Sequence, residues 1–281
     1  MLTKKTISFL LKIGIVAFAL FFLFDQLTAK TTTDQFKDTE ILQQIKDNYL
    51  IVFIVFLMMF LNWLLEAIKW KFMISKIETI SLFKSFRAVF SGITVSAFTP
   101  NRVGEYAGRV FCLERADRIQ AVLITVIGSM AQLLTTIFFG LFGILFLPSF
   151  MPDFAKILYS TEFTYPVFVF VLLLLNTLLI VLFFNTPLLS AILSRIRFLN
   201  KYEKYSSVFS FYSSEELTKI LLLSVSRYIV FTTQSFILLQ VFGVEIVYID
   251  AIVLITSMLF ILSVIPTIAI TEIGVRGSVA L

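Results

Sequence analysis

The sequence contains no histidine and a single cysteine, Cys112. Without histidine the chain cannot build a Ser-His-Asp triad or an HExxH zinc site. One cysteine excludes an internal disulfide and any multi-cysteine metal site. Neither a P-loop nor a GxGxxG motif occurs. We therefore expect no cofactor, no metal and no enzymatic activity.

Charged residues are also scarce. They make up 15% of the chain, against 59% hydrophobic residues, whereas a soluble domain carries about a quarter charged residues. The net charge of +5 is small, and Lys and Arg in a membrane protein mainly mark cytoplasmic loops. The composition therefore indicates an integral membrane protein and not a partner of nucleic acid.

Long apolar stretches predict the membrane spans. A helix needs about 20 apolar residues to cross the hydrocarbon core. Such stretches lie at 6–24, 49–68, 119–147, 166–184, 220–241 and 250–265, of which the last is short. The first exceeds a signal-peptide core and lacks an immediate cleavage site, so we interpret it as a retained helix. We expect one all-α integral membrane domain over 1–281, with about six transmembrane helices plus re-entrant or broken segments.

The basic residues predict the orientation. With the N-terminus in the cytoplasm, sixteen basic residues fall on that side and four on the other, a clear positive-inside bias. Residues 185–219 are basic and aromatic, and we interpret them as an amphipathic cytoplasmic linker on anionic lipid. A tight turn is expected near Gly243.

The orientation requires that residues 88–99 do not cross the membrane. Only about a dozen residues separate Arg87 from Asn101, too few for a spanning helix. The segment is either an interfacial helix or one arm of a re-entrant hairpin that ends at Pro100. Non-helical backbone at membrane depth must be buried in protein or line a polar cavity, so a hairpin indicates a cavity.

A motif with charged residues and glycines follows this segment, TPNRVGEYAGR over 99–109. Gly104 and Gly108 are four residues apart and would leave a smooth strip for close helix packing. Glu105 and Arg109 have the spacing of an ion pair along one helix face. Arg102 and Arg109 are candidates for holding a phosphate. The alternative is an ordinary cytoplasmic loop with a solvated charge pair.

A similar motif, PTIAITEIGVRG, lies at 266–277. Pro266 ends an apolar stretch, and Glu272 and Arg276 repeat the four-residue spacing around Gly274. Two interrupted segments in separate halves of a chain point to a midplane site in transporters built from inverted repeats. An inverted repeat is therefore a hypothesis, with chance similarity as the alternative.

Arg227 lies about eight residues inside the stretch 220–241. An arginine in hydrocarbon is costly and normally faces a partner or a polar cavity. Ser224, Gln234 and the glutamates of the two motifs are candidate partners, and a snorkelling side chain is the alternative. Glu66 is expected to make a local pair with Lys69, and Gln132 an interhelical hydrogen bond.

The two motifs carry a family resemblance. TPNRVGEYAGRVFCLERADR and IPTIAITEIGVRGSVAL resemble the two signatures of the flippase-like transmembrane domain of lysylphosphatidylglycerol synthases. The resemblance covers roughly residue 49 to the end. It implies a helical bundle with re-entrant elements in a bacterial cytoplasmic membrane, which helps to move charged or glycosylated lipids between leaflets. The residues that match the two motifs are Pro100, Arg102, Gly104, Glu105, Arg109, Glu272, Gly274 and Arg276.

Two departures from the family limit what carries over. The soluble aminoacyl-transferase domain of the synthases has no counterpart, so their synthase activity is not transferred. The chain also stops at Leu281, just inside the second motif, so we expect a fragment. The leading hypothesis is an anionic headgroup whose phosphate is held by Arg102, Arg109, Arg227 and Arg276, while Glu105 and Glu272 pair with these arginines or meet a cationic headgroup. The alternatives are a secondary transporter of a small solute and a non-transporting membrane partner of a lipid-modifying or glycosyltransferase enzyme.

Overall fold

The computed structural model describes residues 38–96, 99, 103–150, 156, 164–185, 188, 191 and 200–264. Every regular element in these ranges is a helix, which confirms the all-α class. Four helices are long and apolar enough to cross a membrane: α3 (Tyr49–Ile74), α6 (Arg118–Phe146), α8 (Thr164–Phe184) and α10 (Ser214–Val241). Helix α11 (Tyr248–Val264) is apolar but shorter. The predicted first span, 6–24, lies outside the described residues.

The chain divides into two compact units, residues 1–52 and 53–281. The described part of the first unit contains helix α2 (Asp38–Asp47) and the first turn of α3. Asn48 stands between the two helices and its side-chain amide donates to the carbonyl of Gln44. All the other described elements belong to the second unit.

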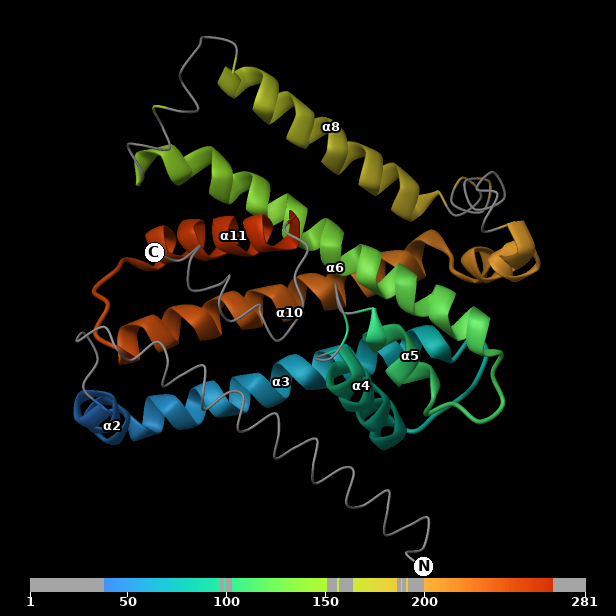
Figure 1. Cartoon of the computed structure of the whole chain (residues 1–281), viewed down its shortest axis with the longest axis horizontal. Helices are drawn as coiled ribbons and strands as arrows, with labels where there is room; N and C mark the ends of the chain where they lie inside the picture. Colours follow the sequence, from blue (N-terminus) through green and yellow to red (C-terminus); the bar gives the residue numbers. More distant parts are fainter. Residues whose placement is uncertain are drawn as a thin grey trace, which may run out of the picture. The chain divides into compact units, whose positions relative to one another are not determined.

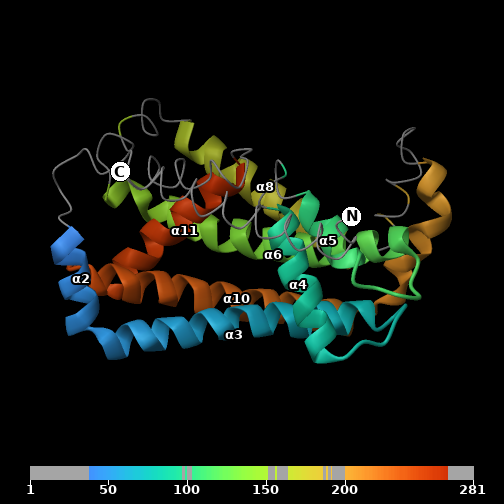
Figure 2. The ribbon, with the colours of Figure 1, turned by 60° about the horizontal axis from the view of Figure 1, so that its bottom comes forward.

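Helices α3 and α10 run antiparallel along each other (Figures 1 and 2). Gln234 donates to the carbonyl of Val55 near one end of the pair. Near the other end, the Lys76 ammonium lies 2.7 Å from the Glu216 carboxylate. This register brings the polar residues in the middle of α3 opposite Arg227.

The start of α10 differs from the sequence prediction. The helix begins at Ser214, so the last six residues of the predicted linker 185–219 are helical. Ser213 and Glu216 form a capping box, in which each side chain accepts the other residue's backbone N–H. Such a cap fixes a helix start independently of apolar character, which is why a hydropathy criterion placed the start too late.

The 3-10 helix η2 (Asn200–Phe211) leads into α10 and is anchored in the core. Val208 and Phe209 are buried there. The Tyr212 hydroxyl, just after η2, donates to the carbonyl of Met73 at 2.7 Å. These contacts attach the end of the predicted linker to the end of α3.

One buried apolar core joins four helix ends. It contains Trp70 near the end of α3, Ile124 near the start of α6, Phe183 at the end of α8 and Leu217 at the start of α10. The end of α3, the start of α6, the end of α8 and the start of α10 therefore lie together. Spans that cross the membrane in alternating directions would place these four ends on the same side. Away from the core α8 exposes long apolar side chains, such as Phe170 at 64% and Leu174 at 58%, which suits a helix that faces lipid.

Helices α4 (Leu82–Ser96) and α5 (Gly104–Val110) form a short helical hairpin beside α3. The two arms touch through glycine: a Cβ added to Gly108 would lie 2.6 Å from the Ser91 carbonyl oxygen and 2.7 Å from the Gly92 Cα. Ser85 donates to the carbonyl of Ala67 at 2.6 Å and attaches α4 to α3. Residues 88–96 thus form part of one arm of a helical hairpin, and the choice between an interfacial and a re-entrant position stays a prediction.

The predicted turn near Gly243 is present between α10 and α11. Gly243 has φ 77°, a left-handed conformation that favours glycine. The N–H of Val244 bonds to the carbonyl of Leu239, and the Gln240 side chain donates to the carbonyl of Ile246. The turn therefore ends α10 and returns the chain along the bundle.

The loop after α5 is fastened by Glu78, which lies between α3 and α4. One of its carboxylate oxygens accepts the N–H groups of Glu114, Arg115 and Ala116 at 3.1, 2.8 and 2.9 Å. The other binds the Lys84 ammonium at 3.0 Å. Burial raises the pKa of Glu78, but the N–H groups of Arg115 and Ala116 and the Lys84 side chain lower it more, to about 2.

Candidate functional site

A group of charged and polar side chains lies inside the bundle where α3, α5 and α10 meet. We call it the Glu66 cluster. Its members are Asn62, Glu66 and Lys69 on α3, Glu105 and Arg109 on α5, and Ser224 and Arg227 on α10.

Glu66 is the centre of the cluster because its carboxylate pairs with three cations. Oε1 lies 2.8 Å from Arg109 Nη1. Oε2 lies 2.9 Å from Lys69 Nζ and 2.8 Å from Arg227 Nη1. The Glu66 side chain is only 5% exposed, so these charge-assisted contacts form away from bulk water and are strong ones.

Arg109 reaches Glu66 from the hairpin. It also pairs with Glu105, four residues earlier on α5, as the sequence spacing predicted. The Arg109 Nε is buried and has no hydrogen-bond partner among the described residues. The close contact of Gly108 with α4 determines where α5 lies, and therefore where the Arg109 guanidinium lies.

Arg227 has different partners from those expected. Its Nη1 binds Glu66 and its Nε donates to Asn62 Oδ1 at 2.9 Å, while the Asn62 amide returns a bond to the Arg227 carbonyl. Ser224 instead accepts from Lys69, and Gln234 donates to backbone. The predicted partners Ser224 and Gln234 are therefore wrong, as is Glu105, which pairs with Arg109.

The cluster contains more positive than negative charge. Lys69, Arg109 and Arg227 face the carboxylates of Glu66 and Glu105, so one positive charge is left over. The Lys69 and Arg109 side chains are 3% and 4% exposed, whereas Arg227 is 28% and Glu105 27% exposed. Arg227 is thus the cation that an outside group can reach.

The chemistry of the cluster suits an oxyanion. Guanidinium and ammonium groups supply N–H donors, and the planar arginine fork matches phosphate and carboxylate. Within the described ranges no group of three acidic, histidine or cysteine side chains could hold a metal ion. The cluster therefore has the kind of donor groups that an anion-binding site uses.

The structure brings together only part of the predicted site. Glu105, Arg109 and Arg227 belong to the Glu66 cluster, and Gly104 and Gly108 both pack closely against the chain around α4. Pro100, Arg102, Pro266, Glu272, Gly274 and Arg276 lie outside the described residues. The inverted-repeat hypothesis depends on them and stays a prediction.

Sequence reasoning missed the central role of α3. The local pair of Glu66 with Lys69 is present, but the contacts of Glu66 with Arg109 and Arg227 were not foreseen. A signal existed, because Asn62, Glu66 and Lys69 follow one another at intervals of four and three residues in an otherwise apolar helix. That spacing places them on one face.

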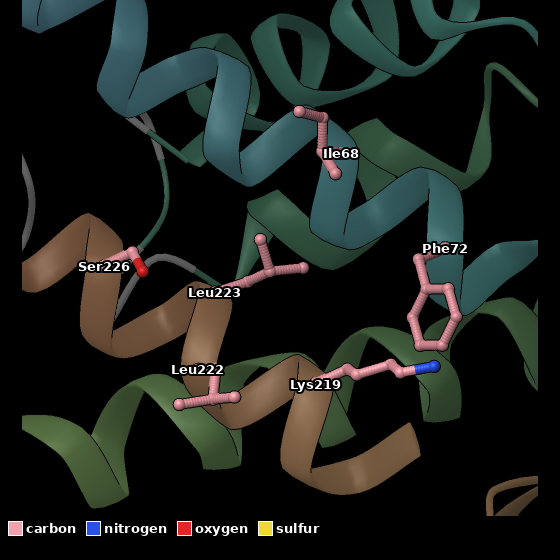
Figure 3. Close-up of a pocket in the computed structure, with 6 residues that line it drawn as sticks. All are labelled: Ile68, Phe72, Lys219, Leu222, Leu223 and Ser226. Carbon is pink, nitrogen blue, oxygen red and sulfur yellow. The ribbon is translucent and has the colours of Figure 1, made fainter. Parts of the chain in front are cut away.

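A shallow groove of about 340 Å³ runs between α3 and α10 (Figure 3). Its walls are mostly apolar, with Lys219 as the charged side chain. The lining residues are Ile68, Phe72, Lys219, Leu222, Leu223 and Ser226. Ser226 immediately precedes Arg227, so the groove and the Glu66 cluster occupy neighbouring faces of α10.

The fold and the cluster together define a polytopic α-helical membrane protein with a buried, positively charged polar site. The chain belongs to the family described as the lysylphosphatidylglycerol synthase TM region, whose model matches residues 9–279. This match confirms the resemblance seen in the two motifs. It concerns the membrane region of that family and assigns no reaction to this chain. No curated protein and no solved structure matches the chain.

Proposed function

We propose that this protein binds the phosphate-bearing headgroup of an anionic lipid at the Glu66 cluster and helps the lipid to move between leaflets. The observation that supports the proposal is the excess positive charge of the cluster, with Arg227 partly exposed at its edge. An ionisable group among spanning helices is costly and typically marks a substrate path.

The described residues suggest separate roles for the two arginines. Arg227 contacts the headgroup, whereas Arg109, which is 4% exposed and held by two carboxylates, positions Glu66. The neighbouring apolar groove suits an acyl chain. Glu272 and Arg276 of the second motif, with Arg102, belong to the same proposal as further headgroup contacts.

The membrane and the orientation are part of the proposal. We place the protein in a bacterial cytoplasmic membrane with its N-terminus in the cytoplasm. The positive-inside bias supports this orientation, and so does the common core that joins the basic ends of α3, α6 and α10.

The proposal is tested by reconstitution in liposomes that contain fluorescent phosphatidylglycerol. A membrane-impermeant quencher measures how much label becomes accessible. The protein should accelerate exchange over empty liposomes, and Arg227→Gln should slow it at least about tenfold, since a hydrogen bond to a charged group contributes about 1.5–3 kcal/mol. Arg87→Gln, the same change at an exposed residue of α4, is the matched control and should exchange at the wild-type rate.

Two results would contradict the proposal. If folded protein exchanges no anionic, aminoacylated or glycosylated lipid, the protein does not move lipids between leaflets. Equal rates of exchange by wild type and Arg227→Gln would show that the Glu66 cluster takes no part in lipid movement. Uptake of a soluble solute driven by a proton or sodium gradient would favour the transporter alternative, and co-purification of a lipid-modifying enzyme without exchange would favour the accessory one.

A further inference from the structure

The Glu66 carboxylate occupies the position where a bound anion would find its cations. It contacts Lys69, Arg109 and Arg227 at 2.8–2.9 Å. We propose that Glu66 is an internal counter-anion, which an anionic headgroup must displace from Arg227 in order to bind. This inference rests on the proposed function and concerns the step by which the ligand enters the site.

The sharing of cations makes such a displacement feasible. Oε2 of Glu66 binds both Lys69 and Arg227, and Oε1 binds Arg109. When Nη1 of Arg227 exchanges Glu66 for a ligand, Glu66 keeps Lys69 and Arg109 as cationic partners. A buried carboxylate without a partner would be strongly destabilising, but Glu66 is never without one during this exchange.

Arg227 is the cation suited to the exchange. Its side chain is 28% exposed, against 3% for Lys69 and 4% for Arg109. Asn62 holds its Nε at 2.9 Å, so the guanidinium keeps its orientation while Nη1 changes partner. Among the described residues its Nη2 has no hydrogen-bond partner, so Nη2 can meet a phosphate first and Nη1 joins it when Glu66 is displaced.

The competition predicts selectivity for charge. A zwitterionic or neutral headgroup carries too little net negative charge to replace a carboxylate at Arg227, whereas a phosphodiester with net charge −1 can. Glu66 thus lowers the affinity for every ligand and keeps the site closed to lipids without net negative charge. Removing its charge should raise affinity, whereas adding a carboxylate nearby should lower it.

The test measures lipid binding and not transport. Full-length protein in phosphatidylcholine nanodiscs is titrated with short-chain phosphatidylglycerol. Glu66→Gln should bind about tenfold more tightly than wild type, and Asn62→Asp about tenfold more weakly. A residue with a merely structural role would weaken binding when changed, so tighter binding by Glu66→Gln is the decisive readout. Binding by Glu66→Gln that is equal to or weaker than wild type overturns the proposal.

Failure of this inference is distinguishable from failure of the proposed function. If wild type and Arg227→Gln bind phosphatidylglycerol equally, the cluster is not the lipid site and both ideas fall. If Arg227→Gln abolishes binding while Glu66→Gln does not tighten it, the proposed role of Glu66 as a counter-anion is refuted and the proposed function stands. Should Glu66→Gln yield no folded protein, Glu66→Asp decides. The aspartate side chain is one methylene shorter and keeps the negative charge, but it holds the carboxylate farther from Arg227. Tighter binding by Glu66→Asp therefore supports the proposal, and unchanged or weaker binding overturns it.

Discussion

Replacing Gly108 with alanine should destabilise the protein although alanine is the better helix former. In an open helix position the change gains up to about 1 kcal/mol. Here the new Cβ would meet the Ser91 oxygen at 2.6 Å, the Gly92 Cα at 2.7 Å and the Gly92 nitrogen at 2.9 Å. All three are backbone atoms, so no side chain can turn away and α4 must move.

The expected magnitude follows from opposing effects. Overpacking costs about 1–3 kcal/mol, which exceeds the gain in helix propensity, so we expect a net loss on the order of 1–2 kcal/mol. For a domain of this size each kcal/mol lowers the Tm by roughly 2–4 °C. Thermal unfolding of purified protein in detergent should therefore show Gly108→Ala melting several degrees below wild type.

Gly128→Ala is the matched control. Its Cβ would also meet an atom at 2.6 Å, but that atom is the Met73 Cε at the end of a flexible side chain. Methionine has three rotatable bonds and can move aside, so Gly128→Ala should melt at or above the wild-type temperature. A Gly108→Ala variant as stable as wild type would refute the reasoning about the hairpin contact.

Three further predictions concern the polar contacts outside the Glu66 cluster. Glu78→Gln should loosen the loop after α5 and speed its cleavage by trypsin, because the folded pKa of about 2 lies below the usual value of about 4.3. For the same reason the wild-type carboxylate should stabilise the fold fully above about pH 4.5, and a melting series should show this stability lost as the pH falls toward 2. Tyr212→Phe should lower the free energy of unfolding by about 0.5–1.5 kcal/mol in denaturant titrations, since it removes the 2.7 Å hydrogen bond to the carbonyl of Met73, which then keeps only the longer bond from the Lys76 N–H at 3.4 Å. A double-mutant cycle on Lys76 and Glu216 should give a coupling below about 1 kcal/mol, because both side chains are more than 20% exposed.

The sequence predicted the helices well because a membrane span leaves a long apolar signal. The stretches 49–68, 119–147, 166–184 and 220–241 all lie within described helices or match them closely. Local polar contacts were also readable. The pair of Glu105 with Arg109 follows from helix geometry alone.

The contacts between helices could not be read in the same way. Glu66 and Arg227 are 161 residues apart, and Asn62 and Arg227 are 165 apart. Spacing indicates which face of a helix a residue occupies, but not which other helix lies against it. Without the register of α3 against α10, the nearby Ser224 was as reasonable a partner for Arg227 as the distant Glu66.

The local pair of Glu66 and Lys69 has a consequence for how the chain is synthesised. Helix α3 is made long before α10 and must settle in the bilayer while Arg227 does not yet exist. Because the two opposite charges lie one helical turn apart, at 2.9 Å, they cancel within α3 itself. The helix can therefore integrate without an uncompensated charge, and it later receives Arg227 at a carboxylate that already has a partner.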